Sequence, residues 1–126
     1  MKEEIWKPIK GYENYLISSK GRVKSLNMYN KKEPKILKPK LGKNGYYSVS
    51  IGSKNKRKMF LVHRLVAEAF IPNPDHKPCI NHLSEIKTQN NVENLEWASY
   101  QHNNTYGTKI ERYIDTRGVK IKCLNL

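Results

Sequence analysis

The chain has 126 residues, of which 37% are hydrophobic and 28% charged, enough for one ordinary domain or two very small ones. No apolar run approaches the ~20 residues of a membrane-spanning helix, and the first ten residues lack the apolar core of a signal peptide. We therefore expect neither a membrane partner nor export. Cys79 and Cys123 form no CxxC pair, so we expect reduced thiols in a cytoplasmic protein.

The positive charge is concentrated in the first half of the chain. The net charge is +13, but residues 1–60 contain 16 Lys and Arg against 4 Asp and Glu, whereas residues 61–126 contain 8 against 7. This asymmetry favours a protein in which one part holds a polyanion, for which nucleic acid is the leading candidate. The alternative is a lysine-rich surface that only keeps the protein soluble.

Residues 1–60 carry the pattern of short strands. Apolar and polar residues alternate in YLIS, GRVKSL, KILKPKL, YYSVSI and KMFLV, and Gly, Asn or Pro separates these runs. The clearest hairpin runs through 46–51, turns at 52–56 and returns through 57–62. We expect a small antiparallel sheet and, on it and the helix that follows, basic side chains that contact phosphates. These are Lys20, Arg22, Lys24, Lys38, Lys40, Lys54, Lys56, Arg57, Lys58 and Arg64.

The pattern becomes helical at residue 61. LVHRLVAEAF places six apolar residues on one stripe, and the prolines that follow end the helix. Next come a short strand that ends near His82, a polar loop, and a second strand or turn in VENLEWAS. Ser99 could then cap a short helix over 100–106 that Gly107 closes.

Four polar side chains fall into this strand–loop–strand–helix unit: Asn81, His82, Asn94 and Asn103. If the two strands pair and the helix folds back on them, all four converge on one small cleft. Neutral imidazole is a common base for activating water near pH 7, and amide oxygens are hard ligands suited to Mg²⁺ or Mn²⁺. A divalent metal supplies positive charge to a phosphodiester under attack. The set is therefore a candidate site for phosphodiester hydrolysis.

The stretch INHLSEIKTQNNVENLEW, followed by ASYQHNN, resembles the HNH homing-endonuclease motif, and VHRLVAEAFIPNP resembles that family's lead-in helix. EEIWKPIKGYENYLISSKGRVKSL and KILKPKLGKNGYYSVSI resemble the nuclease-associated modular (NUMOD-type) domain of phage and intron endonucleases. The resemblance implies an α+β fold, with a small antiparallel β-rich module at 1–60 and a ββα-metal finger with its lead-in helix at 61–107. Residues 108–126 would be an edge strand, a tail, or the truncated start of a further module.

The resemblance also implies a role for each residue of the set. His82 matches the general base, Asn81 and Asn103 match two metal ligands, and Asn94 matches the asparagine that braces the hairpin loop. The family cuts DNA by attack of an activated water and leaves 5′-phosphate and 3′-hydroxyl ends. The implied partner is double-stranded DNA, the implied cofactor is Mg²⁺ or Mn²⁺, and the implied setting is a bacterial or phage-infected cell. The oligomeric state, a monomer being one option, stays open.

Two other functions stay open. Ser84 and Glu85 stand where many relatives have Asp-Gly, and both implied ligands are neutral amides, which favours a DNA-binding or regulatory protein that cleaves weakly or not at all. The second alternative function is that of a structural zinc module. Its ligands would be Cys79, His82, His102 and Cys123. His102 also competes with Asn103 for the ligand position on the short helix, where spacing favours Asn103. For His63, in the first helix, we expect a structural or phosphate-contacting role.

Overall fold

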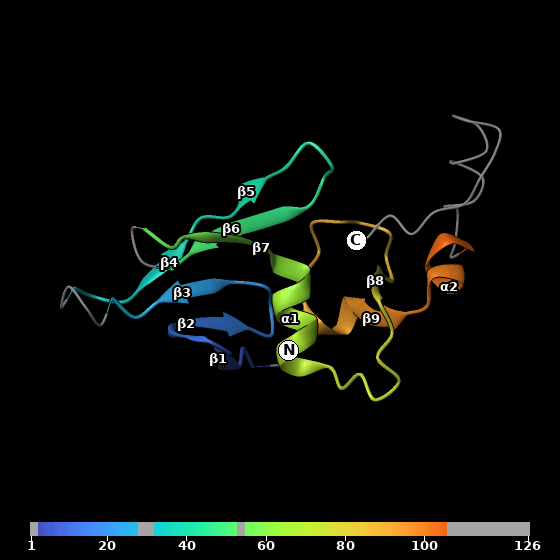
Figure 1. The fold of residues 1–126 in the computed structure, drawn as a ribbon, viewed down its shortest axis with the longest axis horizontal. Helices are drawn as coiled ribbons and strands as arrows, with labels where there is room; N and C mark the ends of the chain where they lie inside the picture. The colour runs from blue at the N-terminus through green and yellow to red at the C-terminus, as the bar shows by residue number, and fades with distance from the viewer. Residues whose placement is uncertain (1–2, 28–31, 53–54, 106–126) are drawn as a thin grey trace.

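The computed structural model describes residues 3–27, 32–52 and 55–105 (Figure 1). Within these ranges, short strands dominate the first half and two helices and one further hairpin follow. None of the helices described is long and apolar enough to cross a membrane. The elements are β1 (Trp6–Ile9), β2 (Tyr12–Ser18), β3 (Val23–Ser25), β4 (Lys35–Leu37), β5 (Lys40–Leu41), β6 (Tyr47–Ile51), β7 (Lys58–Leu61), α1 (Val62–Phe70), β8 (Cys79–His82), the 3₁₀ turn η1 (Val92–Asn94), β9 (Leu95–Ala98) and α2 (Tyr100–Thr105).

The strands form three small antiparallel sheets. β1 to β4 lie side by side in chain order, β5 to β7 form a second sheet, and β8 pairs with β9. The expected combination of small antiparallel sheets with few helices is confirmed. The first half, for which one small sheet was expected, contains two.

The hairpin predicted over 46–51 and 57–62 is present as β6 and β7, with Ile51 paired to Lys58. Val49 and Ile51, two positions apart on β6, both face the core because alternate residues of a strand lie on the same side. The turn requires glycine at position 52. Gly52 has a φ of 120°, and a Cβ there would lie 2.6 Å from the carbonyl oxygen of Lys56.

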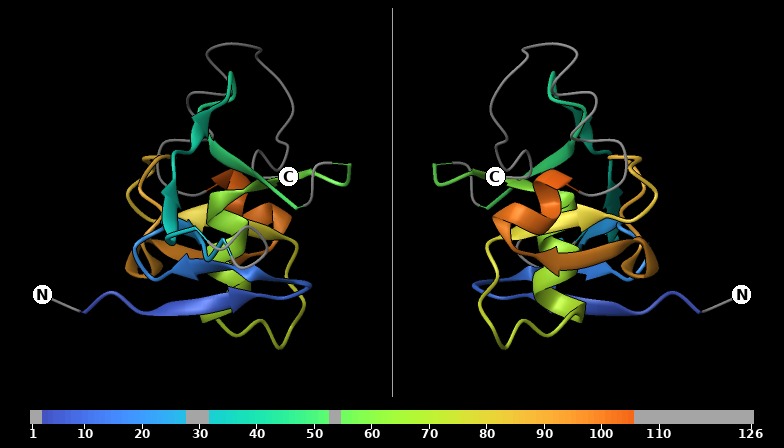
Figure 2. Two further views of the ribbon diagram at one scale, coloured as in Figure 1. Left: turned by 90° about the vertical axis from the view of Figure 1, so that its left-hand side faces the viewer. Right: turned by 90° about the vertical axis from the view of Figure 1, so that its right-hand side faces the viewer.

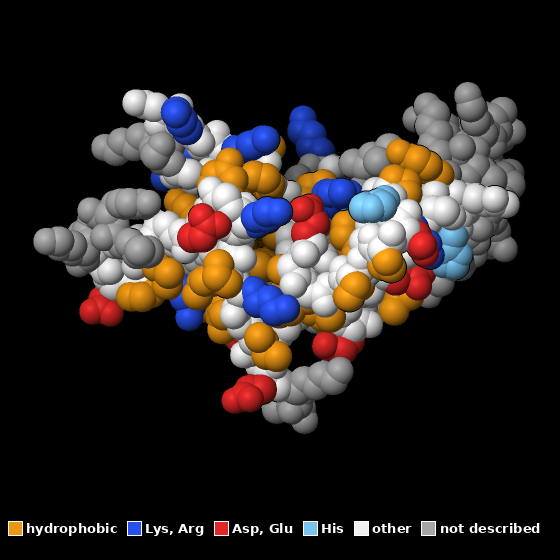
Figure 3. All heavy atoms as spheres, turned by 60° about the horizontal axis from the view of Figure 1, so that its bottom comes forward, with side chains coloured by type: hydrophobic (Ala, Val, Ile, Leu, Met, Phe, Trp, Pro, Cys, Tyr) orange, Lys and Arg blue, Asp and Glu red, His pale blue; other side chains and the backbone are white. Residues whose placement is uncertain are grey.

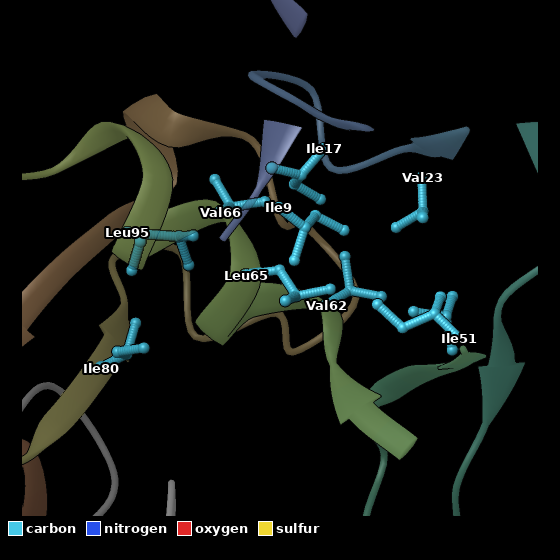
Figure 4. Packing of buried hydrophobic residues seen from close by; sticks show 11 residues of the cluster. Ile9, Ile17, Val23, Ile51, Val62, Leu65, Val66, Ile80 and Leu95 are labelled. Atoms are coloured by element: carbon cyan, nitrogen blue, oxygen red, sulfur yellow. The ribbon is translucent and has the colours of Figure 1, made fainter. Parts of the chain in front are cut away.

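α1 lies between the N-terminal sheets and the β8–β9 hairpin (Figures 1 and 2). Its buried stripe packs on both, so one hydrophobic cluster joins the two halves of the chain (Figure 4). The predicted boundary between residues 60 and 61 falls inside β7, and Leu61, predicted to be helical, is that strand's last residue. The cluster includes Ile9, Ile17, Val23, Val49, Ile51, Val62, Leu65, Val66, Ala67, Ile80 and Leu95.

The start of α2 is as predicted. The backbone N–H of His102 donates to the hydroxyl of Ser99 at 3.1 Å, which caps one of the free donors of the first helical turn. The predicted end of this helix at residues 106–107 and the three options for 108–126 lie outside the described residues.

Candidate active site

The β8–β9 hairpin carries the first two residues of the predicted set. All four residues of β8 are buried. In the antiparallel register Asn81 lies opposite Glu96 and His82 lies opposite Leu95. Because neighbouring residues of a strand point to opposite faces, Asn81 and His82 meet different surroundings although they are adjacent in sequence.

His82 is only 2% exposed, and Asn90 holds its ring. The Nε2 atom of His82 lies 2.9 Å from the Oδ1 atom of Asn90, which is itself buried. Since an amide oxygen can only accept, the proton of the neutral ring is on Nε2 and the lone pair is on Nδ1. Sequence reasoning assigned no role to Asn90. Nothing in its local pattern distinguishes it from Asn91 beside it.

Asn94 closes the loop between β8 and β9. Its Oδ1 accepts from the backbone N–H of Ser84 and its Nδ2 donates to the carbonyl of Gln89, both at 2.8 Å. Its own carbonyl accepts from the N–H of Leu83 at 2.8 Å. Glu85, which stands where many relatives have glycine, has a φ of 62°, in the left-handed region that favours glycine. The loop therefore keeps a turn suited to glycine and relies on Asn94 to hold it.

Two further rings stand behind His82. The ring centroid of His63, on α1, lies 5.1 Å from that of His82, and Tyr46 lies 4.9 Å from His63 and 5.9 Å from His82. His63 is fully buried, and neither of its ring nitrogens has a hydrogen-bond partner among the described residues. Burial, and then the charges of His82 and Arg64, lower the pKa of His63 to about 3, while burial raises the pKa of Tyr46 to about 12. Both rings are neutral at pH 7.

A carboxylate that sequence reasoning missed stands beside Asn81. Oε1 of Glu96 accepts from Nδ2 of Asn81 at 3.1 Å and from Nε2 of His102 at 2.8 Å. The site is therefore not limited to neutral amides. The signal for Glu96 is its place opposite Asn81, which becomes visible only once the hairpin register is fixed.

α2 packs against β8 and brings Asn103 to the hairpin. Asn103 is fully buried, and its backbone N–H donates to the carbonyl of Ser99 at 3.0 Å. The side chain of His102 is 52% exposed and pairs with Glu96. Adjacent helical residues point about 100° apart, so the helix directs only one of the two inward. That residue is Asn103; the ligand roles themselves stay predictions.

The zinc alternative finds little support in residues 3–27, 32–52 and 55–105. They contain no group of three or more His, Cys, Asp or Glu side chains that could hold a metal ion. Cys79 is disulfide-bonded, which corrects the expectation of a reduced thiol. The cysteine with which it pairs lies outside the described residues. Cys79 is thus no thiolate ligand in this structure.

Most of the predicted phosphate contacts are exposed on the N-terminal sheets and their turns. Lys54 lies outside the described residues. Arg64 differs from the rest, because its guanidinium lies 3.8 Å from Glu68 and over the ring of Trp97. On the face drawn in Figure 3, Lys and Arg lie beside Asp, Glu and hydrophobic side chains, so that face is not uniformly basic.

Two of the basic residues already have partners within the first sheet. Arg22 forms a two-contact ion pair with Glu4 and lowers the pKa of that carboxyl to about 2. Lys24 lies over the ring of Trp6, with Nζ 4.2 Å from the ring centroid. These contacts hold both cations in place at the outer surface of β3 and the turn before it.

Comparison with known proteins gives a family motif and several relatives. Residues 4–52 match the NUMOD4 motif. A protein of Acanthamoeba polyphaga mimivirus named as an HNH endonuclease is 39% identical over 109 residues, which are 86% of this chain and 32% of that protein. DNA endonuclease I-HmuI of Bacillus phage SP01 is 36% identical over 99 residues, which are 78% of this chain and 54% of that protein. The chain thus spans about a third to a half of the length of these relatives.

A solved structure on DNA binding and cleavage by the HNH homing endonuclease I-HmuI aligns with this fold. The TM-score is 0.68 at 29% sequence identity, and the alignment covers 92% of this chain and 69% of that chain. The predicted resemblance to HNH homing endonucleases with a NUMOD-type domain is therefore confirmed.

Proposed function

We propose that this chain is a metal-dependent DNA endonuclease in which His82 is the general base. The observation that carries the proposal is the setting of His82. It is a buried imidazole fixed by Asn90, beside Asn81 on the same strand, in a chain similar to HNH endonucleases over most of its length. Because the chain spans only part of those relatives, its activity, substrate and cofactor are all part of the proposal.

In the proposed reaction, a water oxygen attacks the phosphorus and the bond to the 3′ oxygen breaks. His82 takes the proton of that water at Nδ1, because its other nitrogen already carries the proton that is donated to Asn90. The leaving oxygen takes a proton from solvent, so that the ends are a 5′-phosphate and a 3′-hydroxyl. The base works in its neutral form, which histidine adopts readily near pH 7.

Three side chains of the β8–β9–α2 unit fit a hard divalent cation in the chemistry of their donors. Asn81 on β8 and Asn103 on α2 offer amide oxygens, and Glu96 adds a negative charge next to Asn81. Mg²⁺ or Mn²⁺, when bound there, would stabilise the charge on the phosphate and on the leaving oxygen. In this proposal β8, β9 and α2 form the ββα-metal unit. The cytoplasmic location stays a prediction, and the oligomeric state stays open.

The second candidate is a DNA-binding protein that cleaves little or not at all. The neutral amides at positions 81 and 103 favour it, because they attract a cation less strongly than carboxylates do. Glu96 weakens the case for this second candidate, because it adds a negative charge next to Asn81 that the sequence analysis did not assign to the site.

Incubation of the purified chain with supercoiled plasmid or phage duplex DNA and Mn²⁺ or Mg²⁺ tests the proposal. We expect nicks or breaks that EDTA abolishes and that fall by roughly 100-fold or more in His82→Ala, since loss of a general base has effects of this size. Binding of the same DNA should weaken steeply with salt, because it depends on many phosphate contacts.

The outcomes separate the two candidates. Cleavage that persists unchanged in His82→Ala contradicts the proposed mechanism. Salt-sensitive binding without cleavage by the wild-type chain supports the second candidate. A flat response of binding to salt removes the phosphate-binding role of the N-terminal sheets.

A further inference from the structure

The turn between β2 and β3 touches the loop that holds His82. The backbone N–H of Val92 donates to the carbonyl of Ser19 at 2.9 Å. A Cβ added at Gly21 would lie 2.9 Å from the Cβ of Asn90 and 3.0 Å from its carbonyl oxygen. Only a residue without a side chain allows this approach. Asn90 is the residue whose amide oxygen meets Nε2 of His82.

The turn is itself held firmly. The buried hydroxyl of Ser18 accepts from the backbone N–H groups of Lys20 and Arg22 at 3.2 and 3.0 Å, and Gly21 donates to the carbonyl of Ser18 at 3.0 Å. Gly21 has a φ of 85°, which the turn needs and which glycine adopts without strain. The surface that meets Asn90 is therefore rigid backbone rather than a flexible side chain.

We propose that Asn90 is a positioning residue for His82 and that the β2–β3 turn, through Gly21, fixes Asn90 in place. The N-terminal sheet then has two roles. It contacts DNA, and its β2–β3 turn holds Asn90, which orients the imidazole of His82; we call the contact of Gly21 with Asn90 the seat. This inference rests on the proposed function of His82, but not on the metal or on the identity of the DNA target.

The arrangement joins two predicted phosphate contacts to the catalytic loop. Lys20 and Arg22 flank Gly21 directly, and Arg22 is anchored by Glu4. DNA held by this turn would therefore be only a few residues from the backbone that seats Asn90. Loss of the seat should lower the rate of cleavage and leave DNA affinity nearly unchanged, because the phosphate contacts remain.

The first experiment compares Asn90→Leu with Asn90→Asp, two side chains of nearly equal size. Only Asp keeps an oxygen that can accept from Nε2 of His82. We expect kcat on supercoiled plasmid to fall roughly 10- to 100-fold in Asn90→Leu, as expected when a reacting group is displaced, with recovery of most of that loss in Asn90→Asp. The affinity for DNA should stay within about threefold. Equal kcat in the Leu variant and the wild type overturns the positioning role.

The second experiment compares Gly21→Ala with Gly11→Ala. Gly11 has a φ of 83° but nothing within 4 Å of an added Cβ, so both variants strain the backbone and only Gly21→Ala displaces Asn90. We expect similar losses of thermal stability and a fall in kcat of about tenfold for Gly21→Ala alone. If both variants cleave equally, the N-terminal seat is overturned. If Gly21→Ala does not fold, the Asn90 pair still decides the role of Asn90.

A third measurement does not depend on cleavage. Two-bond ¹H–¹⁵N correlation spectra of histidine-labelled protein report which ring nitrogen of His82 carries the proton. The wild type should show the Nε2–H form, and Asn90→Leu should lose that preference. A wild-type ring protonated on Nδ1 overturns the inference even if DNA is cut. An Nε2–H ring in a chain that cuts no DNA leaves the seat intact and refutes the proposed function instead.

Discussion

Two parts of the candidate site, which start at neighbouring residues of β8, are built differently. We call the group of His82, Asn90 and Asn94 the loop end, and the group of Asn81, Glu96 and His102 the helix end. At the loop end, His82, Asn90 and Asn94 are buried; His82 is hydrogen-bonded to Asn90, and Asn94 is hydrogen-bonded to Ser84 and Gln89, all of them neutral partners. At the helix end, Asn81 meets the carboxylate of Glu96, which is partly exposed and also pairs with a histidine of α2. The loop end is suited to holding one ring in one orientation, and the helix end is suited to attracting a cation.

The difference follows from what burial does to charge. An unpaired charge at the buried loop end would carry a large desolvation penalty, whereas neutral amides satisfy their partners without it. At the helix end water still reaches Glu96 and His102, so a charge is tolerated there. Geometry and charge are therefore supplied by two neighbouring parts of one hairpin, and each part can be changed separately.

The largest expected effect concerns pH and the buried ring of His63, which lies beside that of His82. The pKa of His63 is about 3 in the folded protein against an ordinary value of 6.5. Below pH 6.5 the unfolded chain therefore takes up a proton that the folded protein refuses, and stability falls until the pH reaches about 3. Between pH 7 and pH 4 this amounts to roughly 3 kcal/mol, which His63→Phe should remove.

Urea unfolding at pH 7 and pH 4 measures this effect. His76→Asn is the control, because His76 is exposed and its replacement should leave the pH dependence as it is. If wild type and His63→Phe lose the same stability on acidification, the ring of His63 is not isolated from water in the way that its burial implies.

The second effect removes the brace of the loop end. Asn94→Ala leaves the N–H of Ser84 and the carbonyl of Gln89 without their partner, which should lower the free energy of unfolding by about 2 kcal/mol and reduce cleavage strongly. Asn91→Ala, which loses only a 3.5 Å contact with Glu93, should change it by less than about 0.5 kcal/mol. If a denaturant titration shows that Asn94→Ala and Asn91→Ala lose the same free energy of unfolding, Asn94 does not brace the loop.

The third effect tests the helix end. Glu96→Gln keeps the acceptor for Asn81 but removes the charge, so the Mn²⁺ concentration for half-maximal cleavage should rise about tenfold, while kcat at saturating Mn²⁺ stays close to that of the wild type. Glu93→Gln, an exposed change on η1, is the matched control. An unchanged metal requirement would remove Glu96 from the cation site.

The smallest effect is expected at His102. Its contact with Glu96 is half exposed, and exposed ion pairs contribute little, so His102→Gln should alter stability by less than about 0.5 kcal/mol and the metal requirement by less than about threefold. Asn103→Ala in the same cleavage assay should have a far larger effect. The reverse order would make His102 the ligand on α2 and overturn the assignment of Asn103.

Local pattern was sufficient for the elements of the hairpin and helices. The alternation in YYSVSI and KMFLV predicted β6 and β7, the helical stripe predicted α1, and Ser99 predicted the start of α2. These signals depend on residues a few positions apart. Leu61 was assigned to the helix because its hydrophobicity fits both a strand end and a helical stripe.

The contacts that complete the candidate site could not be predicted in the same way. Glu96 meets Asn81 only in one strand register, and Gly21 meets Asn90 although the two are far apart in sequence. Both contacts are properties of the packed fold rather than of a local period.

The junction of β7 and α1 contains no linker, because β7 ends at Leu61 and α1 begins at Val62. The core that surrounds this junction joins the N-terminal sheets to the hairpin of His82. If the sheets bind DNA and His82 cleaves it, as proposed, this direct junction fixes the distance between the bound stretch of DNA and the bond that is cut. The proposed function then predicts that each cut falls at a constant number of base pairs from the bound sequence.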